Sequence, residues 1–270
     1  MAVRDITLGQ YYPGESPIHR LDARTKIICA LVYLVSLFVV RSFSAFALCI
    51  VLLAVVISVS RIPFRFISKG LKPIIFIIIF TMVINLLFTD AGNVLLQIGP
   101  VNITTEGIYR AAFMGLRLVL LIFGSSVLTL TTKPIELTDG LEKLLSPLSK
   151  LGLPAHELAM MMTIALRFIP TLLEETDKIM KAQTARGADF ENGNLREKAK
   201  ALIPLLVPLF VSAFRIAGDL AMAMEARCYH GGAGRTRMHQ ARFGKGDAIA
   251  AVVMAVYLAL IILSRRIDLF

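Results

Sequence analysis

Two arginines of this chain stand in closely similar triplets, and both side chains could bind carboxylates. The triplets are Ala185-Arg186-Gly187 and Ala226-Arg227-Cys228. The planar guanidinium group carries a fork of N–H donors that holds a carboxylate through two hydrogen bonds, which lysine does not reproduce. One arginine at a helix end carries little information, because it favours the helix dipole and is common there. Two such triplets, each closing a long helical pattern, predict paired contact points for partner proteins.

Groups that could catalyse a reaction are sparse. A membrane-embedded enzyme is the main alternative, and its active site would use His156 with Glu157, or His230 and His239 near a glycine-rich turn. The chain has no HExxH, no GxxxxGK[ST] and no DxxD-type carboxylate cluster, so the usual groups for such chemistry are missing. A self-sufficient secondary carrier is a third interpretation, which lacks intramembrane acidic residues and paired broken helices. We therefore expect no catalytic residue, metal ion or cofactor on this chain.

Composition predicts an integral membrane protein. Of the 270 residues, 56% are hydrophobic, and the mean hydropathy is +0.72. A soluble core of this length needs less apolar side chain, so lipid must be part of the solvent. The three cysteines form no CxxC or Cys/His cluster, which predicts neither a disulfide framework nor a zinc site.

Apolar runs predict an all-α, polytopic protein with about five transmembrane helices. The run 27–60 would be about 50 Å long as one helix, against about 30 Å of hydrocarbon, so Arg41 and Ser42 should mark a turn between two spans. The other spans are expected in 73–88, 111–130 and 248–263. Within the fourth, Arg117 is either a functional intramembrane charge or an arginine used in packing or snorkelling.

Basic residues orient these spans. They gather in 1–26, 61–72 and 133–247, whereas the connection 89–110 has only Arg110. Five spans put the three basic segments on one face, which is the cytoplasmic one by the positive-inside rule, although Arg265 and Arg266 would lie outside. The predicted parts are a cytoplasmic N-terminal segment (1–26), four transmembrane helices (27–132), a cytoplasmic region (133–246), and a last transmembrane helix with the C-terminus (247–270).

The region 133–246 is predicted to contain long amphipathic helices. A short helix is expected over 134–146, and two long ones over 155–186 and 195–227, the second kinked by Pro204 and Pro208. Gly187 is expected to cap the first long helix at its C-terminus. These helices carry many methionines, which form either an adaptable contact surface or an ordinary core.

The sequence resembles the transmembrane, or T, component of energy-coupling-factor (ECF) transporters, a class of ABC importers. The likeness extends across nearly the whole chain. It is carried by the segment 16–26 (Ser-Pro-Ile-His-Arg-Leu-Asp-Ala-Arg-Thr-Lys), the segment 165–170 (Ala-Leu-Arg-Phe-Ile-Pro) and the two triplets. The second triplet has Cys228 where the family typically has glycine.

The resemblance implies a non-catalytic subunit that couples two cytoplasmic ABC ATPases to a small substrate-binding membrane subunit, for uptake of vitamins or other micronutrients. ATP and Mg²⁺ would be bound by the ATPases, no cofactor by this chain, and no nucleic acid is expected. A dedicated cobalt/nickel or biotin importer is the alternative. Arg186 and Arg227 would contact the ATPases, with their four triplet neighbours beside them. The substrate-binding subunit would contact apolar faces that include Met160, Met161, Met162, Ile169, Leu173, Met180 and Met222.

Overall fold

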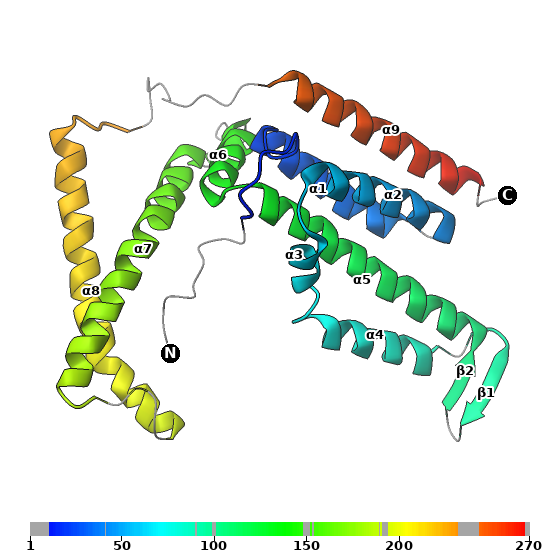
Figure 1. The fold of residues 1–270 in the computed structure, drawn as a ribbon, viewed down its shortest axis with the longest axis horizontal. Helices are drawn as coiled ribbons and strands as arrows, with labels where there is room; N and C mark the ends of the chain where they lie inside the picture. Colours follow the sequence, from blue (N-terminus) through cyan, green and yellow to red (C-terminus); the bar gives the residue numbers. More distant parts are fainter. Residues whose placement is uncertain are drawn as a thin grey trace. The chain divides into compact units, whose positions relative to one another are not determined.

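In the described part of the chain, the regular elements are helices apart from one pair of short strands (Figure 1), as a computed structural model shows. The structure describes residues 11–267 except 41, 90, 99–100, 148–151, 153, 189, 191–193 and 232–242. The helices are α1 (Ala23–Val39), α2 (Phe43–Ser60), α3 (Phe64–Lys69), α4 (Ile75–Leu87), α5 (Thr105–Thr131), α6 (Pro134–Leu145), α7 (Ala155–Ala185), α8 (Leu195–Ala226) and α9 (Lys245–Ile267). The all-α prediction is confirmed.

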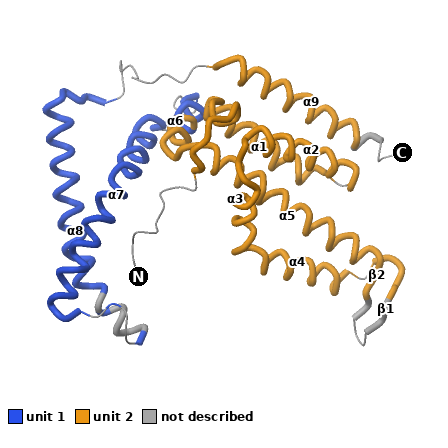
Figure 2. The backbone as a smooth tube through the Cα atoms, viewed as in Figure 1, with its two compact units in different colours: residues 1–8, 141–240 blue, residues 9–140, 241–270 orange. Residues whose placement is uncertain are grey.

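Two compact units make up the chain (Figure 2). Unit 1 contains residues 1–8 and 141–240, and with them α7 and α8. Unit 2 contains residues 9–140 and 241–270, and with them the helices α1 to α5 and α9. The long helices with the arginine triplets therefore belong to a different unit from most of the predicted membrane spans.

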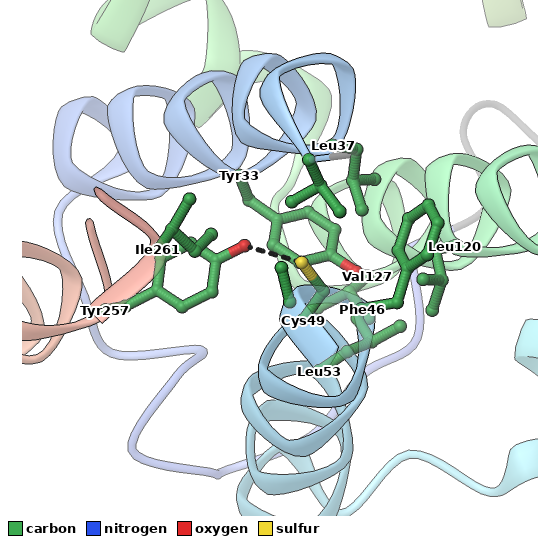
Figure 3. Close-up of a cluster of buried hydrophobic side chains, with 11 residues drawn as sticks. Tyr33, Leu37, Phe46, Cys49, Leu53, Leu120, Val127, Tyr257 and Ile261 are labelled. Carbon is green, nitrogen blue, oxygen red and sulfur yellow. Dashed lines mark hydrogen bonds between the residues drawn. The ribbon is translucent and has the colours of Figure 1, made fainter. Parts of the chain in front are cut away.

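Aromatic and aliphatic side chains of four helices form the core of unit 2 (Figure 3). Leu37 of α1, Phe46 and Cys49 of α2, Leu120 of α5 and Tyr257 of α9 all lie in it. The hydroxyl of Tyr257 is 3.2 Å from the Cys49 sulfur and also forms a hydrogen bond of 2.7 Å with the hydroxyl of Ser36 on α1. A buried tyrosine hydroxyl needs a hydrogen-bond partner, and here the partners lie on two other helices. These contacts connect α9 to α1 and α2, although some 200 residues separate them in the sequence.

Small residues let α5 lie close to its neighbours. Gly107, Ala111 and Gly115 recur at every fourth position, and a Cβ on Gly107 would lie 3.1 Å from the carbonyl oxygen of Leu86 at the end of α4. A Cβ on Gly115 would lie 2.7 Å from the sulfur of Met82. Such small-residue spacing allows helix backbones to approach in membrane proteins, which explains why α4 runs alongside α5 (Figure 1).

The connection 89–110 differs most from the prediction. It contains an antiparallel pair of strands, β1 (Val94–Ile98) and β2 (Val101–Thr104). α5 then begins at Thr105, six residues before the predicted span, because the hydroxyl of Thr104 accepts a hydrogen bond from the Gly107 N–H and caps the helix. The short helix α3 was also not predicted. Arg41, one of the two predicted turn residues, lies outside the described residues, and its neighbour Ser42 caps α2.

The N-terminal segment that resembles the family holds three helix ends together. The ammonium group of Lys26 donates to the carbonyl of His19 at 2.9 Å and to the carbonyl of Thr131, at the end of α5, at 3.0 Å. The N–H of Asp22, the residue that caps α1, donates to the Asp247 carboxylate at the start of α9 at 2.9 Å. This segment therefore fixes where α1, α5 and α9 meet.

Arg117 contacts the end of α1. Its guanidinium donates to the carbonyl of Val40 at 2.9 Å and lies 5.0 Å from the ring centre of Phe113. Val40 is the C-terminal cap of α1, where helix carbonyls lack partners within the helix. These are the contacts of an arginine used in helix packing, one of the two interpretations that the sequence left open.

Within the part of the chain that the structure describes, five helical segments are long and apolar enough to cross a membrane. They are Phe43–Ser60, Thr105–Thr131, Ala155–Ala185, Leu202–Ala226 and Lys245–Ser264. The number agrees with the prediction, but the membership differs. α7 and α8, which were predicted to be cytoplasmic, are among the five segments. α4 and α1, with 13 and 17 residues, are shorter than any of them. By length and composition, α7 and α8 are thus candidates for spanning the bilayer as well as for lying on its surface.

Candidate functional site at the ends of α7 and α8

α7 and α8 pack against each other in opposite directions (Figure 1). Near the start of α7, the sulfur of Met160 accepts a hydrogen bond of 2.9 Å from the hydroxyl of Tyr229, which follows α8. In the middle, the hydroxyl of Ser212 donates to the Glu175 carboxylate at 3.2 Å. At the other end, the side-chain amide of Gln183 donates to a carbonyl near the start of α8. The contacts fix the register of an antiparallel helix pair.

The two arginine triplets end these helices with the same hydrogen-bond pattern. After α7, the N–H groups of Gly187 and Ala188 bond the carbonyls of Thr184 and Gln183, at 2.9 and 3.0 Å. After α8, the N–H groups of Cys228 and Tyr229 bond the carbonyls of Glu225 and Met224, at 2.8 and 3.0 Å. Both are Schellman motifs, with the arginine as the C-terminal cap residue and a left-handed residue behind it. Arg186 and Arg227 therefore occupy equivalent positions.

The residue behind each arginine has positive φ. Gly187 has a φ of 91°, as a predicted glycine cap requires, and Cys228 has a φ of 54°. Glycine adopts this conformation without a steric penalty, whereas a residue with a Cβ does not. The cysteine in the second triplet thus keeps the backbone geometry of the glycine in the first.

Both arginines are exposed to solvent. Arg186, Arg227 and their triplet neighbours Ala185, Gly187, Ala226 and Cys228 all lie on the surface of the structure. Within the described residues, no carboxylate forms an ion pair with either arginine. The two guanidinium groups are therefore available for a partner.

The two arginines lie at opposite ends of the helix pair. The Tyr229 contact brings the end of α8 beside Met160, and Arg186 follows Met160 by 26 residues on α7. At 1.5 Å per helical residue, the two ends are about 39 Å apart. A single small binding pocket does not reach both ends, so the two arginines are two separate candidate contact points.

The predicted methionine surface is only partly exposed. Met161, Met162 and Met222 have exposed fractions of 54%, 46% and 63%. Ile169, Leu173 and Met180 are half-buried, and so is Met160, whose sulfur bonds Tyr229. The structure thus divides the predicted contact residues into two groups, the more exposed of which lies near the start of α7 and the end of α8.

A larger apolar stripe on α8 was not predicted. It consists of Ile203, Leu206, Val207, Phe210, Val211 and Phe214, and every member is at least 46% exposed. The spacing by three and four places these residues on one face of the helix. The same spacing is readable from the sequence, although Met222 was the only residue of α8 in the predicted methionine surface. We call these six residues the α8 stripe; a contiguous exposed apolar surface of this kind marks a partner or membrane contact.

Among the described residues, the alternative catalytic candidates are not brought together. His156 forms its contact with Glu142 of α6, at 3.1 Å, and not with Glu157. His230 is exposed, and His239 lies outside the described residues. Among the described residues, no group of three or more His, Cys, Asp or Glu side chains could hold a metal ion.

Comparison with known proteins identifies the family of the chain. The profile of the family described as CbiQ, cobalt transport protein, matches residues 14–239. The energy-coupling factor transporter transmembrane protein EcfT of Clostridium kluyveri is 57% identical over 264 residues, which cover 97% of this chain and 98% of the relative. The EcfT proteins of Thermosediminibacter oceani and Bacillus subtilis are 56% and 50% identical, over 98% and 96% of this chain and 100% and 97% of theirs.

These names describe transmembrane components of ECF transporters, which agrees with a multi-pass membrane subunit of such a complex. They do not favour the dedicated cobalt, nickel or biotin importer. The match covers both arginine triplets and the N-terminal segment that connects α1, α5 and α9. The chain belongs to the family of transmembrane T components of ECF transporters.

Proposed function

We propose that this subunit transmits the motion of two cytoplasmic ABC ATPases to a substrate-binding membrane subunit, with one arginine end on each ATPase. The observation that carries the proposal is the pair of equivalent caps, which present two exposed arginines about 39 Å apart. Two ATPase subunits with similar grooves would each receive one guanidinium group. ATP and Mg²⁺ are bound in the ATPases, and this chain binds no cofactor.

This role requires the helix pair to lie along the cytoplasmic membrane surface. If α7 and α8 crossed about 30 Å of hydrocarbon, their opposite ends would place Arg186 and Arg227 on opposite faces of the membrane. The charged side chains in the second half of α7, which include Glu174 and Lys178, support the surface position because they favour water. Both ends, and with them the N-terminus, are then cytoplasmic.

The apolar face of the same pair would receive the substrate-binding subunit. The α8 stripe supplies the largest exposed side chains, and Met161, Met162 and Met222 extend the apolar surface. Methionine side chains adapt to different partners, which suits a surface that serves more than one such subunit. The transported compounds, vitamins or other micronutrients, would be selected by that subunit and not by this chain.

Replacing both arginines tests the ATPase contacts. In Arg186→Ala/Arg227→Ala, the chain should still insert into the membrane, while co-purification of the ATPases and uptake of a panel of radiolabelled vitamins should fall. Truncating one partner of a buried charge pair costs about 2 to 5 kcal/mol at an interface, so losing both should reduce assembly by more than tenfold. Lys181→Ala removes a positive charge from the exposed surface of the same helix and is the matched control. Wild-type assembly of the double variant would reject the ATPase contacts.

Labelling with a membrane-impermeant maleimide tests the position of the pair. Cys228 is exposed beside one arginine, and Ala185→Cys adds a thiol beside the other. In variants whose other cysteines are replaced by alanine, each thiol should react in inside-out vesicles and resist the reagent in intact cells. Reaction from opposite faces would mean that the pair crosses the bilayer.

A further inference from the structure

A proline in α8 leaves one backbone carbonyl without its helical donor. In an α-helix the carbonyl of residue 204 accepts the N–H of residue 208, but Pro208 has no N–H. The side-chain amide of Gln183 donates to this Pro204 carbonyl at 3.2 Å. A side chain of α7 thus supplies the hydrogen bond that α8 cannot make for itself.

The same glutamine is part of the cap that presents Arg186. Its backbone carbonyl accepts the N–H groups of Arg186 and Ala188, each at 3.0 Å. One residue therefore bonds the arginine end of α7 through its backbone and the kink of α8 through its side chain. A displacement of the arginine end is passed to α8 through two hydrogen-bonded groups of Gln183.

The surroundings of the carbonyl make this hydrogen bond more important in the assembled complex. Ile203 and Val207, on either side, are 58% and 59% exposed and belong to the α8 stripe. When a partner or lipid covers the stripe, water is excluded from the carbonyl, and a buried acceptor without a donor is unfavourable. Gln183 then becomes the group that keeps this part of α8 folded against α7.

We propose that Gln183 is a positioning residue that couples the Arg186 end of α7 to the proline kink of α8. The inference rests on the proposed function, because it assigns the route by which force from one ATPase reaches the α8 stripe. It also gives the proline in α8 a role beside the C-terminal cap of α7: Pro208 frees the Pro204 carbonyl, which accepts the hydrogen bond from the Gln183 side chain.

The test combines Gln183→Leu with two proline variants. In the transporter reconstituted with its partner subunits, Gln183→Leu should leave ATPase co-purification unchanged. Uptake per ATP hydrolysed should fall by about two- to tenfold, the range expected for one hydrogen bond. The substrate in this assay is the radiolabelled vitamin that the wild-type complex takes up from the panel described above. Pro208→Ala gives residue 208 an N–H for the carbonyl, so Gln183→Leu should have no further effect in that background.

Pro204→Ala is the matched control. It also removes a proline from α8, but Pro208 remains and the residue 204 carbonyl still lacks its helical donor. Gln183→Leu should therefore lower coupling in this background as it does in the wild type. If Gln183→Leu lowered uptake per ATP hydrolysed equally in the Pro204→Ala and Pro208→Ala backgrounds, the inference would be overturned. The same holds if Gln183→Leu alone left this ratio at the wild-type value.

A distance measurement separates this route from a general loss of stability. Spin labels at Lys181→Cys and Leu206→Cys, both exposed, report on the helix pair near the glutamine. In a background without native cysteines, the distance distribution should broaden with Gln183→Leu and narrow again when Pro208→Ala is added. An unchanged distribution would contradict the inference. Failure of the ATPases to co-purify with the unaltered chain would instead contradict the proposed function.

Discussion

Gly124 of α5 should not accept even one added methyl group. A Cβ at this position would lie 2.5 Å from Cε1 and 2.8 Å from Cδ1 of Tyr33 on α1. The tyrosine is 5% exposed and belongs to the core cluster of Figure 3, so its ring has little room to move. In Gly124→Ala, α1 and α5 must therefore separate, or the ring must leave its rotamer.

The expected cost follows from two opposing effects. Overpacking of a dense core costs about 1 to 3 kcal/mol, whereas alanine is better than glycine within a helix by up to about 1 kcal/mol. The net destabilisation by Gly124→Ala should be about 1 to 2 kcal/mol. Gly218 of α8 has no atom within 4 Å of its added Cβ, so Gly218→Ala should have only the favourable effect.

Thermal unfolding in detergent measures the difference. The chain has no tryptophan, so the fraction of protein that stays monodisperse after heating is followed by size exclusion of a fluorescent fusion. A change of 1 kcal/mol shifts the midpoint by about 2 to 4 °C in a chain of this size, so Gly124→Ala should melt lower and Gly218→Ala no lower than wild type. Tyr33→Leu should recover part of the loss in a double variant. Equal shifts for both glycine variants would refute the packing argument.

Three further changes test other contacts. Lys26→Met leaves the carbonyls of two residues, one of them Thr131, without the ammonium donor and should lower the same midpoint, at a cost of about 1 to 3 kcal/mol for each unpaired group. Arg117→Leu removes the donor to Val40, so α1 should fray at its C-terminus, seen as faster amide exchange there, whereas Arg117→Lys should retain part of the protection. Cys228→Gly should slow amide exchange at the end of α8, and Cys228→Val should accelerate it, because a β-branched residue fits positive φ poorly.

Helices with clear end signals were predictable from the sequence. α7 was predicted to its end because Gly187 is a strong C-terminal signal, and its φ of 91° confirms the cap. The hairpin of β1 and β2 was missed, although the dipeptide Gly99-Pro100 between two short apolar segments is a turn signal. Strands of four or five residues carry too little periodicity to outweigh the expectation of a loop.

The contacts between helices could not be read from the sequence. The hydrogen bond from Gln183 to Pro204 depends on the register of α7 against α8, which packing decides. The sequence predicted a kink at Pro208. It did not predict that Gln183 would donate to the Pro204 carbonyl, which this proline leaves without a helical donor. Likewise, nothing in the sequence indicates that the ammonium group of Lys26 donates to two backbone carbonyls.

The antiparallel arrangement explains why one short motif occurs twice. Two antiparallel helices are related by an approximate twofold axis across the pair, and this axis exchanges their C-terminal ends. Arg186 and Arg227, in equivalent caps, are therefore presented in related orientations at the two ends. Two similar ATPases that pair about a twofold axis would present similar grooves in the same relation. A second arginine placed elsewhere on α8 would lack this relation. Under the proposed function, the repeated cap, more than the repeated residue, would therefore suit the chain to a pair of ATPases.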